Sequence, residues 1–125
     1  MNVIGSRPTG WWRDRPAAAA RFAERLRRFA AGLDEEVILV LDGRPSPQLP
    51  AATVDGVRVV YARRGGPDAA DDRIVELVAA AAKPGEITVF SSDRRLVERV
   101  RELGASARGA GELLRWLDRS EEDEQ

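Results

Sequence analysis

Continuous apolar runs, rich in β-branched residues and closed by turn residues, divide this chain at intervals and predict buried strands. Such runs cover residues 37–41, 57–61 and 87–90, and a shorter strand is expected around Ser106. The first run, VILVL, ends directly at Asp42-Gly43, and the prolines that follow it predict a loop before the second run.

Between these runs, apolar residues recur three and four positions apart, which is the spacing of an amphipathic helix. In the first such segment the apolar face is formed by Phe22, Leu26, Phe29 and Leu33. The pattern predicts helices over residues 16–32, 68–82, 94–103 and 111–117. Because strands alternate with helices, we predict an α/β protein with a mostly parallel sheet covered on both faces.

The length of 125 residues is that of one domain with a real core. The last residues, SEEDEQ, are acidic and carry no apolar pattern. We therefore expect one domain over residues 1–118 and a disordered acidic tail over residues 119–125.

The formal net charge of −1 hides an uneven distribution, because residues 1–30 are rich in arginine. Two interpretations stay open for this arginine-rich segment: a solvated helix face, or a surface that meets phosphates. Lys83 is the one lysine, so genomic base composition also explains part of the enrichment. The acidic tail is suited to cover this basic surface when no other anion is bound, although a solubilising tail is the simpler interpretation.

The composition also limits the available chemistry. The chain has no cysteine and no histidine, which excludes disulfides, thiolate and imidazole metal ligands, and Ser-His or Cys-His triads. No apolar run approaches the length of a membrane span, and the N-terminus lacks the apolar core of a signal peptide. We therefore expect a cytoplasmic protein without a membrane partner.

Four aspartates stand where an α/β protein places the ends of its strands: Asp42, Asp71, Asp72 and Asp93. Carboxylates at the carboxyl ends of parallel strands can converge in the ligand crevice of the sheet, where they are suited to a divalent metal ion.

Each acid also has a structural alternative. Asp68 is placed to cap the helix that follows it, and Asp71 and Asp72 suit the positive end of the helix dipole. Asp93, or Ser92 before it, is placed to cap the next helix, and Asp42 with its following glycine is suited to a simple turn.

Five segments of the chain, in order, carry a resemblance to a known family. They read MNVIGSRPTGWWRDRP, VILVLDGR, GVRVVYARRGGPDAADDRIVE, ITVFSSDRRLVERVRELGA and GAGELLRWL. Together they resemble the NYN domain of the YacP-like group, within the PIN-like ribonucleases. The resemblance implies a Rossmann-like three-layer α/β/α fold with a carboxylate pocket that binds Mg²⁺ or Mn²⁺ and cleaves single-stranded RNA. Whether that RNA is messenger RNA or ribosome-associated RNA stays open.

By position, Asp71 and Asp72 match the family's helix-borne acids, Asp93 matches its later acid, and Asp42 matches an aspartate that often ends the second strand. The resemblance makes Ser92 the small hydroxyl residue beside the last acid, suited to position water or a ligand. It makes Asn2 the asparagine of the opening motif, whose amide is suited to orient a carboxylate or the substrate. Further substrate contacts are expected from arginines next to the acids and from tryptophans near the site: Arg44, Arg94, Arg95, Trp11 and Trp12. Core packing and solvation are the alternatives for these residues, and Trp116 is expected in the core.

The chain departs from the family's opening motif, which reads aspartate, a small residue, a variable residue, then asparagine. Here Met1 stands at the variable position, so the first catalytic aspartate and most of a central strand are expected to be missing. Either the start was assigned too late or this is a shortened member with reduced metal chemistry, and we favour the first.

Two other classes of function stay in view. One is a non-catalytic RNA-binding or ribosome-associated module of the same fold. The other, a phosphate-binding or receiver-type domain, is disfavoured because the chain has no GxGxxG or GxxxxGK[ST] loop and lacks the usual receiver lysine.

Overall fold

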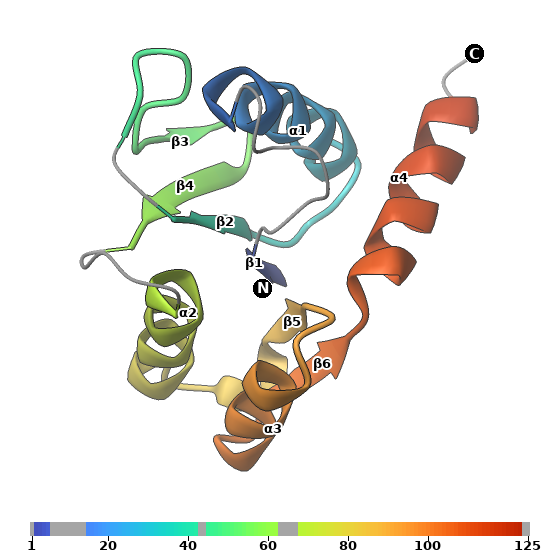
Figure 1. Ribbon diagram of the computed structural model, residues 1–125. Coiled ribbons are helices and arrows are strands. Elements are labelled where there is room, and N and C mark those ends of the chain that lie inside the picture. Colours follow the sequence, from blue (N-terminus) through green and yellow to red (C-terminus); the bar gives the residue numbers. More distant parts are fainter. Residues whose placement is uncertain (1, 6–14, 43–44, 63–67, 124–125) are drawn as a thin grey trace.

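The computed structural model of the protein describes residues 2–5, 15–42, 45–62 and 68–123 (Figure 1). In chain order its strands and helices are β1 (Asn2–Gly5), α1 (Arg15–Ala30), β2 (Val37–Leu41), β3 (Thr53–Val54), β4 (Val57–Tyr61), α2 (Ala69–Ala80), the 3₁₀ turn η1 (Pro84–Glu86), β5 (Thr88–Phe90), α3 (Arg94–Glu102), β6 (Ser106–Arg108) and α4 (Ala110–Asp123). The predicted strands over 37–41, 57–61 and 87–90 and the strand at Ser106 are present, the third beginning one residue later than predicted.

The strands form one sheet in the order β3-β4-β2-β1-β5-β6. All neighbouring pairs are parallel except β3 with β4, which form a hairpin at one edge. Its turn is Asp55-Gly56, where both residues have positive φ, 51° and 83°. An Asp-Gly pair of this kind is the standard sequence signal for a two-residue hairpin, although β3 itself is too short for a periodic pattern.

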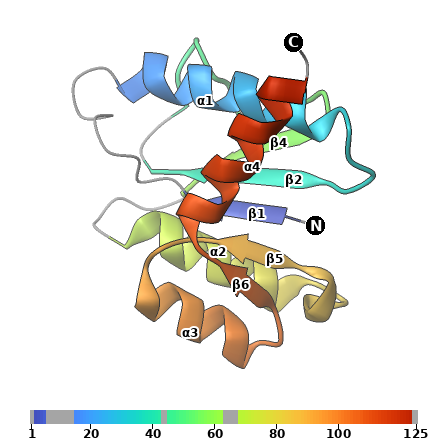
Figure 2. The same ribbon diagram turned by 90° about the vertical axis from the view of Figure 1, so that its right-hand side faces the viewer.

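Helices cover both faces of the sheet, which makes the three-layer α/β/α arrangement (Figures 1 and 2). α1 and α4 share one buried cluster with alternate residues of β2, including Leu39. α2 and α3 share the other cluster with the residues between them, Ile38 and Val40. The predicted α/β fold class with a mostly parallel sheet is therefore confirmed.

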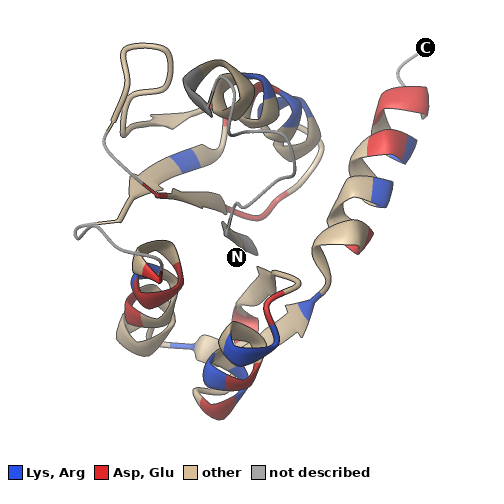
Figure 3. Ribbon diagram, in the orientation of Figure 1, with Lys and Arg blue, Asp and Glu red and all other residues tan. Residues whose placement is uncertain are grey.

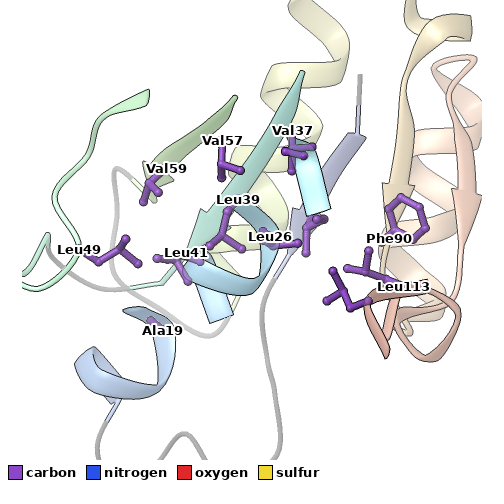
Figure 4. Close-up of a cluster of buried hydrophobic side chains, with 14 residues drawn as sticks. Ala19, Leu26, Val37, Leu39, Leu41, Leu49, Val57, Val59, Phe90 and Leu113 are labelled. Carbon is purple, nitrogen blue, oxygen red and sulfur yellow. The ribbon is translucent and has the colours of Figure 1, made fainter. Parts of the chain in front are cut away.

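The buried stripe of α1 differs from the expected one. Its fully buried positions are small, Ala19, Ala23 and Ala30, together with Leu26, whereas Phe22 and Phe29 are half-buried at the margins. Alanines allow the helix axis to lie close to the sheet, so the larger aromatic rings fit only beside the contact. Figure 4 shows Leu26 next to Leu39 within this cluster.

The centre of the sheet is occupied by β1, the short strand whose upstream part is expected to be missing. β1 pairs in parallel with β2 over four residues and with β5 over three residues. Of its neighbours, β2 has five residues and β5 has three. β1 therefore supplies strand partners to every residue of β5 and to all residues of β2 except Leu41.

The last helix is longer than predicted, and the expectation of a disordered tail from residue 119 is wrong for residues 119–123. α4 continues to Asp123, well beyond the predicted end at residue 117. Its acidic end is held against α1 by ion pairs of Asp118 and Glu121 with Arg25. No single-sequence pattern shows these long-range contacts.

No helix in the described ranges is long and apolar enough to cross a lipid bilayer.

The core predicts a sharp difference between two leucine-to-alanine changes, both in helices. Leu26→Ala removes a fully buried side chain, and we expect it to lower the free energy of unfolding by about 2–5 kcal/mol. Leu114→Ala, at a side chain that is 44% exposed, is expected to cost less than about 1 kcal/mol. Urea unfolding of both variants tests the assignment, and equal losses would show that Leu26 is not a core residue.

Candidate functional site

Three separate segments bring the four aspartates to the carboxyl edge of the sheet. Asp42 follows β2 directly, Asp93 follows β5, and Asp71 and Asp72 lie in the first turn of α2. This edge is where ligands bind in open parallel sheets. β2 and β5 lie on either side of β1, so their ends are two strand spacings, or about 10 Å, apart.

Asp42 is tied to the start of α2. Its Oδ1 accepts a hydrogen bond from the backbone N–H of Ala70 at 3.1 Å. Ala70 is the second residue of the helix, whose N–H has no partner within the helix. Asp68, the expected cap, stands at the N-cap position but makes no side-chain capping bond. The cap of α2 therefore comes from another strand and links β2 to the helix that carries Asp71 and Asp72.

Asp93 caps α3, as one of the sequence alternatives proposes. Its Oδ1 accepts from the backbone N–H of Leu96 at 3.0 Å, and its own N–H donates to Ser91 Oγ at 3.0 Å. The aspartate side chain is exposed. It is thus held in a defined orientation while remaining open to solvent and to a ligand.

Ser92 connects this loop to the last helix. Its Oγ accepts from the backbone N–H of Ala110, the first residue of α4, at 3.3 Å. The backbone N–H of Ser91 donates to the carbonyl of Arg108 at 2.9 Å, just before that helix. The start of α4 is therefore attached to the same loop that carries Asp93.

Asp72 points toward the neighbouring helix. Its Oδ1 accepts from Arg99 at 3.0 Å, and Arg99 lies in the second turn of α3. Asp72 is exposed and Arg99 is half-buried, so this surface pair contributes only about 0–1 kcal/mol to stability. Asp71 is half-buried and has interactions of its own. Asp71 and Asp72 are therefore in different environments, although they are adjacent in the sequence.

The acidic side chains at this edge suit a divalent metal ion that is bound only in part by the protein. Across the described ranges, no three acidic side chains lie together as a ready-made metal cage. Mg²⁺, however, is commonly held by only one or two carboxylates together with waters and substrate phosphates. Exposed or half-exposed carboxylates at one edge fit that kind of site, so the residues present suit an ion that binds along with its substrate.

Asn2 is not brought to the acids. Its backbone pairs with Val37 and Thr88, the first residues of β2 and β5, so it lies at the amino edge of the sheet. That position is about 16 Å along the strands from Asp42. The backbone of Asn2 therefore lies away from the carboxylates, one of the two groups that its amide is expected to orient.

The remaining expected contacts fall into two groups. Arg94 and Arg95 are exposed in the first turn of α3, directly after Asp93. Arg44, Trp11 and Trp12 lie outside the described residues. Two residues of the site are absent from the sequence-based prediction, Arg99 and Ser91. The sequence did offer a signal for Ser91, because it shows two serines in a row before Asp93. It offered none for Arg99, because the contact between Arg99 and Asp72 depends on how α2 and α3 pack.

Trp116, expected in the core, is half-buried and packs against the core cluster at its margin. Its ring centroid lies 6.2 Å from that of Phe29 and 5.7 Å from that of Phe90, and the guanidinium of Arg108 lies 5.3 Å from the centroid of the Trp116 ring.

A separate surface hollow of about 460 Å³ lies at the end of α1 and the β3–β4 turn. It is lined by Glu24, Arg27, Arg28, Ala30, Ala31, Asp55 and Gly56. The hollow lies at the amino edge, away from the acids.

Comparison with known proteins agrees with this geometry. A family model described as the YacP-like NYN domain matches residues 2–125. NYN domains belong to the PIN-like ribonuclease superfamily, so the fold is that of RNA-related nucleases, which in general depend on divalent metal ions. The comparison with curated proteins found no match.

Two solved structures share the fold. A crystal structure of a tryptophan-to-leucine mutant of Rae1 (YacP) from Bacillus subtilis matches with a TM-score of 0.74 and 21% identity, covering 98% of this chain and 79% of that one. The crystal structure of Rae1 (YacP) without this change matches with a TM-score of 0.73 and 20% identity, covering 98% and 76%. At these identities the match establishes the fold.

The cap from Asp42 leads to a test with a matched control. Asp42→Ala leaves the N–H of Ala70 without its acceptor, and we expect the free energy of unfolding to fall by about 1 kcal/mol. Asp68→Ala removes no capping bond, and we expect the free energy of unfolding to fall by only about 0.3 kcal/mol, through the lost charge at the helix dipole. Denaturant unfolding measures both, and a larger loss for Asp68→Ala would contradict the assignment.

Proposed function

Because this chain belongs to the YacP-like NYN domain family, we propose that it is an endoribonuclease that cleaves single-stranded RNA with Mg²⁺ or Mn²⁺ bound at its acidic edge. The observation that carries the proposal is the arrival of four aspartates from three segments at the carboxyl edge of a parallel sheet. Oxygen donors of this kind suit hard divalent ions.

In this proposal, Asp71 and Asp93 are the metal-binding acids. Asp93 is fixed by the hydrogen bonds to Leu96 and Ser91, and its exposed side chain faces solvent. When bound, such an ion activates water and neutralises charge on the phosphodiester. Asp42 supports the site by anchoring the start of α2, the helix that carries Asp71.

Asp72 has a supporting role in the same proposal. The contact with Arg99 directs one of its carboxylate oxygens at α3 and offsets its charge. We therefore assign Asp72 chiefly to the connection between α2 and α3, although it belongs to the same acidic pair in sequence.

Substrate binding is assigned to cations and dipoles near the acids. Arg94 and Arg95 are exposed beside Asp93 and are suited to RNA phosphates. Ser92 holds the loop to α4 through Ala110. We also assign Arg44 to phosphates, and Trp11 and Trp12 to bases, because of their positions in the sequence.

A second candidate is a non-catalytic RNA-binding module of the same fold. The observation in its favour is that three of the described acids already have structural partners: Asp42 and Asp93 cap helices, and Asp72 pairs with Arg99. Such a module would bind RNA without metal-dependent cleavage, so one assay separates the two candidates.

The test of the nuclease is cleavage of a labelled single-stranded RNA with Mg²⁺, with Mn²⁺ or with EDTA. We expect cleavage with a metal ion and none with EDTA. Asp71→Asn and Asp93→Asn are expected to reduce the rate by at least about 100-fold while RNA binding is retained. Asparagine is as good a helix cap as aspartate, so Asp93→Asn removes the charge and preserves the cap.

The matched control is Asp34→Asn, which makes the same chemical change at an exposed turn before β2, at the amino edge. It should cleave at the rate of the unchanged protein. A rate that EDTA and both site variants leave unaltered would identify a contaminating nuclease. RNA binding without cleavage under every condition would favour the non-catalytic module.

The two acids of α2 are expected to differ in the same assay. Asp72→Asn keeps a hydrogen-bond acceptor for Arg99, and we expect a change in rate of less than about threefold. Arg99→Gln should resemble it, because it removes the other half of the same pair. A loss for Asp72→Asn as large as that for Asp71→Asn would place Asp72 at the metal ion instead.

A further inference from the structure

The outer face of α1 carries a stripe of arginines. Arg21, Arg25 and Arg28 are four and three residues apart, so they lie on one side of the helix. Arg21 and Arg28 are exposed and Arg25 is half-buried. Along the helix axis this arginine stripe extends about 10 Å.

The acidic end of α4 lies against the arginine stripe. Arg25 donates to both carboxylate oxygens of Glu121, from Nε at 2.8 Å and from Nη2 at 2.9 Å, and Nη2 also donates to Asp118 at 2.9 Å. Arg28 Nη2 lies 4.0 Å from Glu121 Oε2. Figure 3 shows the acidic residues at the end of α4 and the basic residues along α1, and Figure 2 shows α4 crossing the strands to reach α1.

This end of α4 contributes no residue to the core among those described. The buried positions of the helix are Leu113 and Leu117, which pack with Trp116 in the cluster beneath α1. From Asp118 onward the helix has no apolar residue, and residues 118–122 are exposed or half-buried. Ion pairs rather than apolar burial therefore hold the last turns in place, and pairs of this kind are weak and sensitive to salt.

The contact has the chemistry of phosphate recognition. A guanidinium that binds both oxygens of one carboxylate uses the same fork that it uses for a phosphate. The hydrogen bond between the two residues raises the pKa of Arg25 and lowers the pKa of Glu121, which shows the pair to be attractive on both sides. In this arrangement the acidic end of α4 occupies the position of a polyanion.

We propose that the arginine stripe of α1 is a binding surface for the phosphate backbone of single-stranded RNA, and that the acidic end of α4 covers it until RNA displaces the carboxylates. The inference rests on the proposed function in taking RNA as the partner, but it concerns binding and not cleavage. It assigns a second contact region to the protein, on the opposite face of the sheet from α2 and α3.

A merely structural ion pair would make a different prediction. If Arg25 and Glu121 served only to attach α4, removing the carboxylate would loosen the helix and leave RNA binding unchanged. If the carboxylate competes with RNA, removing it strengthens binding and makes an additional arginine available to phosphates. The salt dependence then becomes steeper, by roughly 0.7 for each new phosphate contact.

The experiment measures binding of a short, fluorescently labelled single-stranded RNA in EDTA, which prevents metal-dependent cleavage, over a series of salt concentrations. We expect Glu121→Gln to raise the affinity at low salt by about threefold or more, with a steeper salt dependence. Adding Arg25→Gln to this variant should remove the gain, because the guanidinium that RNA would bind is then absent.

The matched control is Glu122→Gln, which makes the same charge change in the same helix at the next residue. Glu122 is exposed and makes no ion pair with α1 within the described ranges. If Glu121→Gln and Glu122→Gln change the affinity equally, the inference is overturned and only net charge matters. If the unchanged protein cleaves and binds RNA but Glu121→Gln has no effect, this inference fails alone; if no form binds RNA, the proposed function fails with it.

A second measurement uses the unchanged protein and so does not depend on how any variant folds. In an NMR titration with the same RNA in EDTA, the Nε–H resonance of Arg25 is expected to shift as Glu121 is displaced. The resonance of Arg101, exposed on α3 across the sheet, serves as the reference. An Arg25 resonance that stays unchanged at saturating RNA overturns the proposal.

Discussion

The parallel pairing of β1 with β2 on one side and with β5 on the other joins the two halves of this sheet. One half contains β3, β4 and β2, and the other contains β5 and β6. Asp42 belongs to the first half, whereas Asp93 and the serines before it belong to the second. The separation of the acids is therefore set by one short strand. A change in the register of β1 would move Asp42 relative to Asp93 and alter the whole edge.

The topology also explains why structural and functional roles meet in the same carboxylates. In a parallel sheet, a helix that follows a strand begins near the carboxyl edge, where ligands also bind. The N–H groups of the first helical turn need acceptors there and favour negative charge. Asp42 and Asp93 satisfy this need for α2 and α3. Capping and ligand binding are thus compatible roles, since a carboxylate has two oxygens and one capping bond fixes its orientation.

The opposite face of the sheet from α2 and α3 carries a second electrostatic arrangement, between α1 and α4. Apolar burial at Leu113 and Leu117 anchors the first part of α4 beneath α1. The remaining turns continue because the carboxylates of Asp118 and Glu121 meet Arg25. The helix therefore has a firmly packed beginning and an end held by exposed charges, which makes the end the part most responsive to salt and to other polyanions.

Local pattern was sufficient for most of the fold. The run that became β2 was bounded correctly because both faces of this strand are buried, so every residue is apolar. The run that became β4 was bounded correctly by its β-branched residues, although Arg58 within it is exposed. The carboxyl-edge position of Asp42, Asp71, Asp72 and Asp93 followed from the alternation of strands and helices alone. The cap by Asp93 was one of two visible alternatives, and the bond to Leu96 settles that structural role.

Tertiary structure decided the features that depend on residues far apart in the chain. The cap of α2 comes from Asp42 rather than from Asp68, the adjacent candidate, because the end of β2 lies against that helix. Asp72 differs from Asp71 because the packing of α3 against α2 brings Arg99 to it. The last turns of α4 are held by Arg25, which lies 96 residues before its partner Glu121 in the sequence. Asn2 lies at the amino edge because strand register, which a single sequence does not encode locally, places it opposite Val37 and Thr88. Periodicity reports which side of an element is buried, but a hydrogen bond or ion pair between distant segments exists only once the chain has packed.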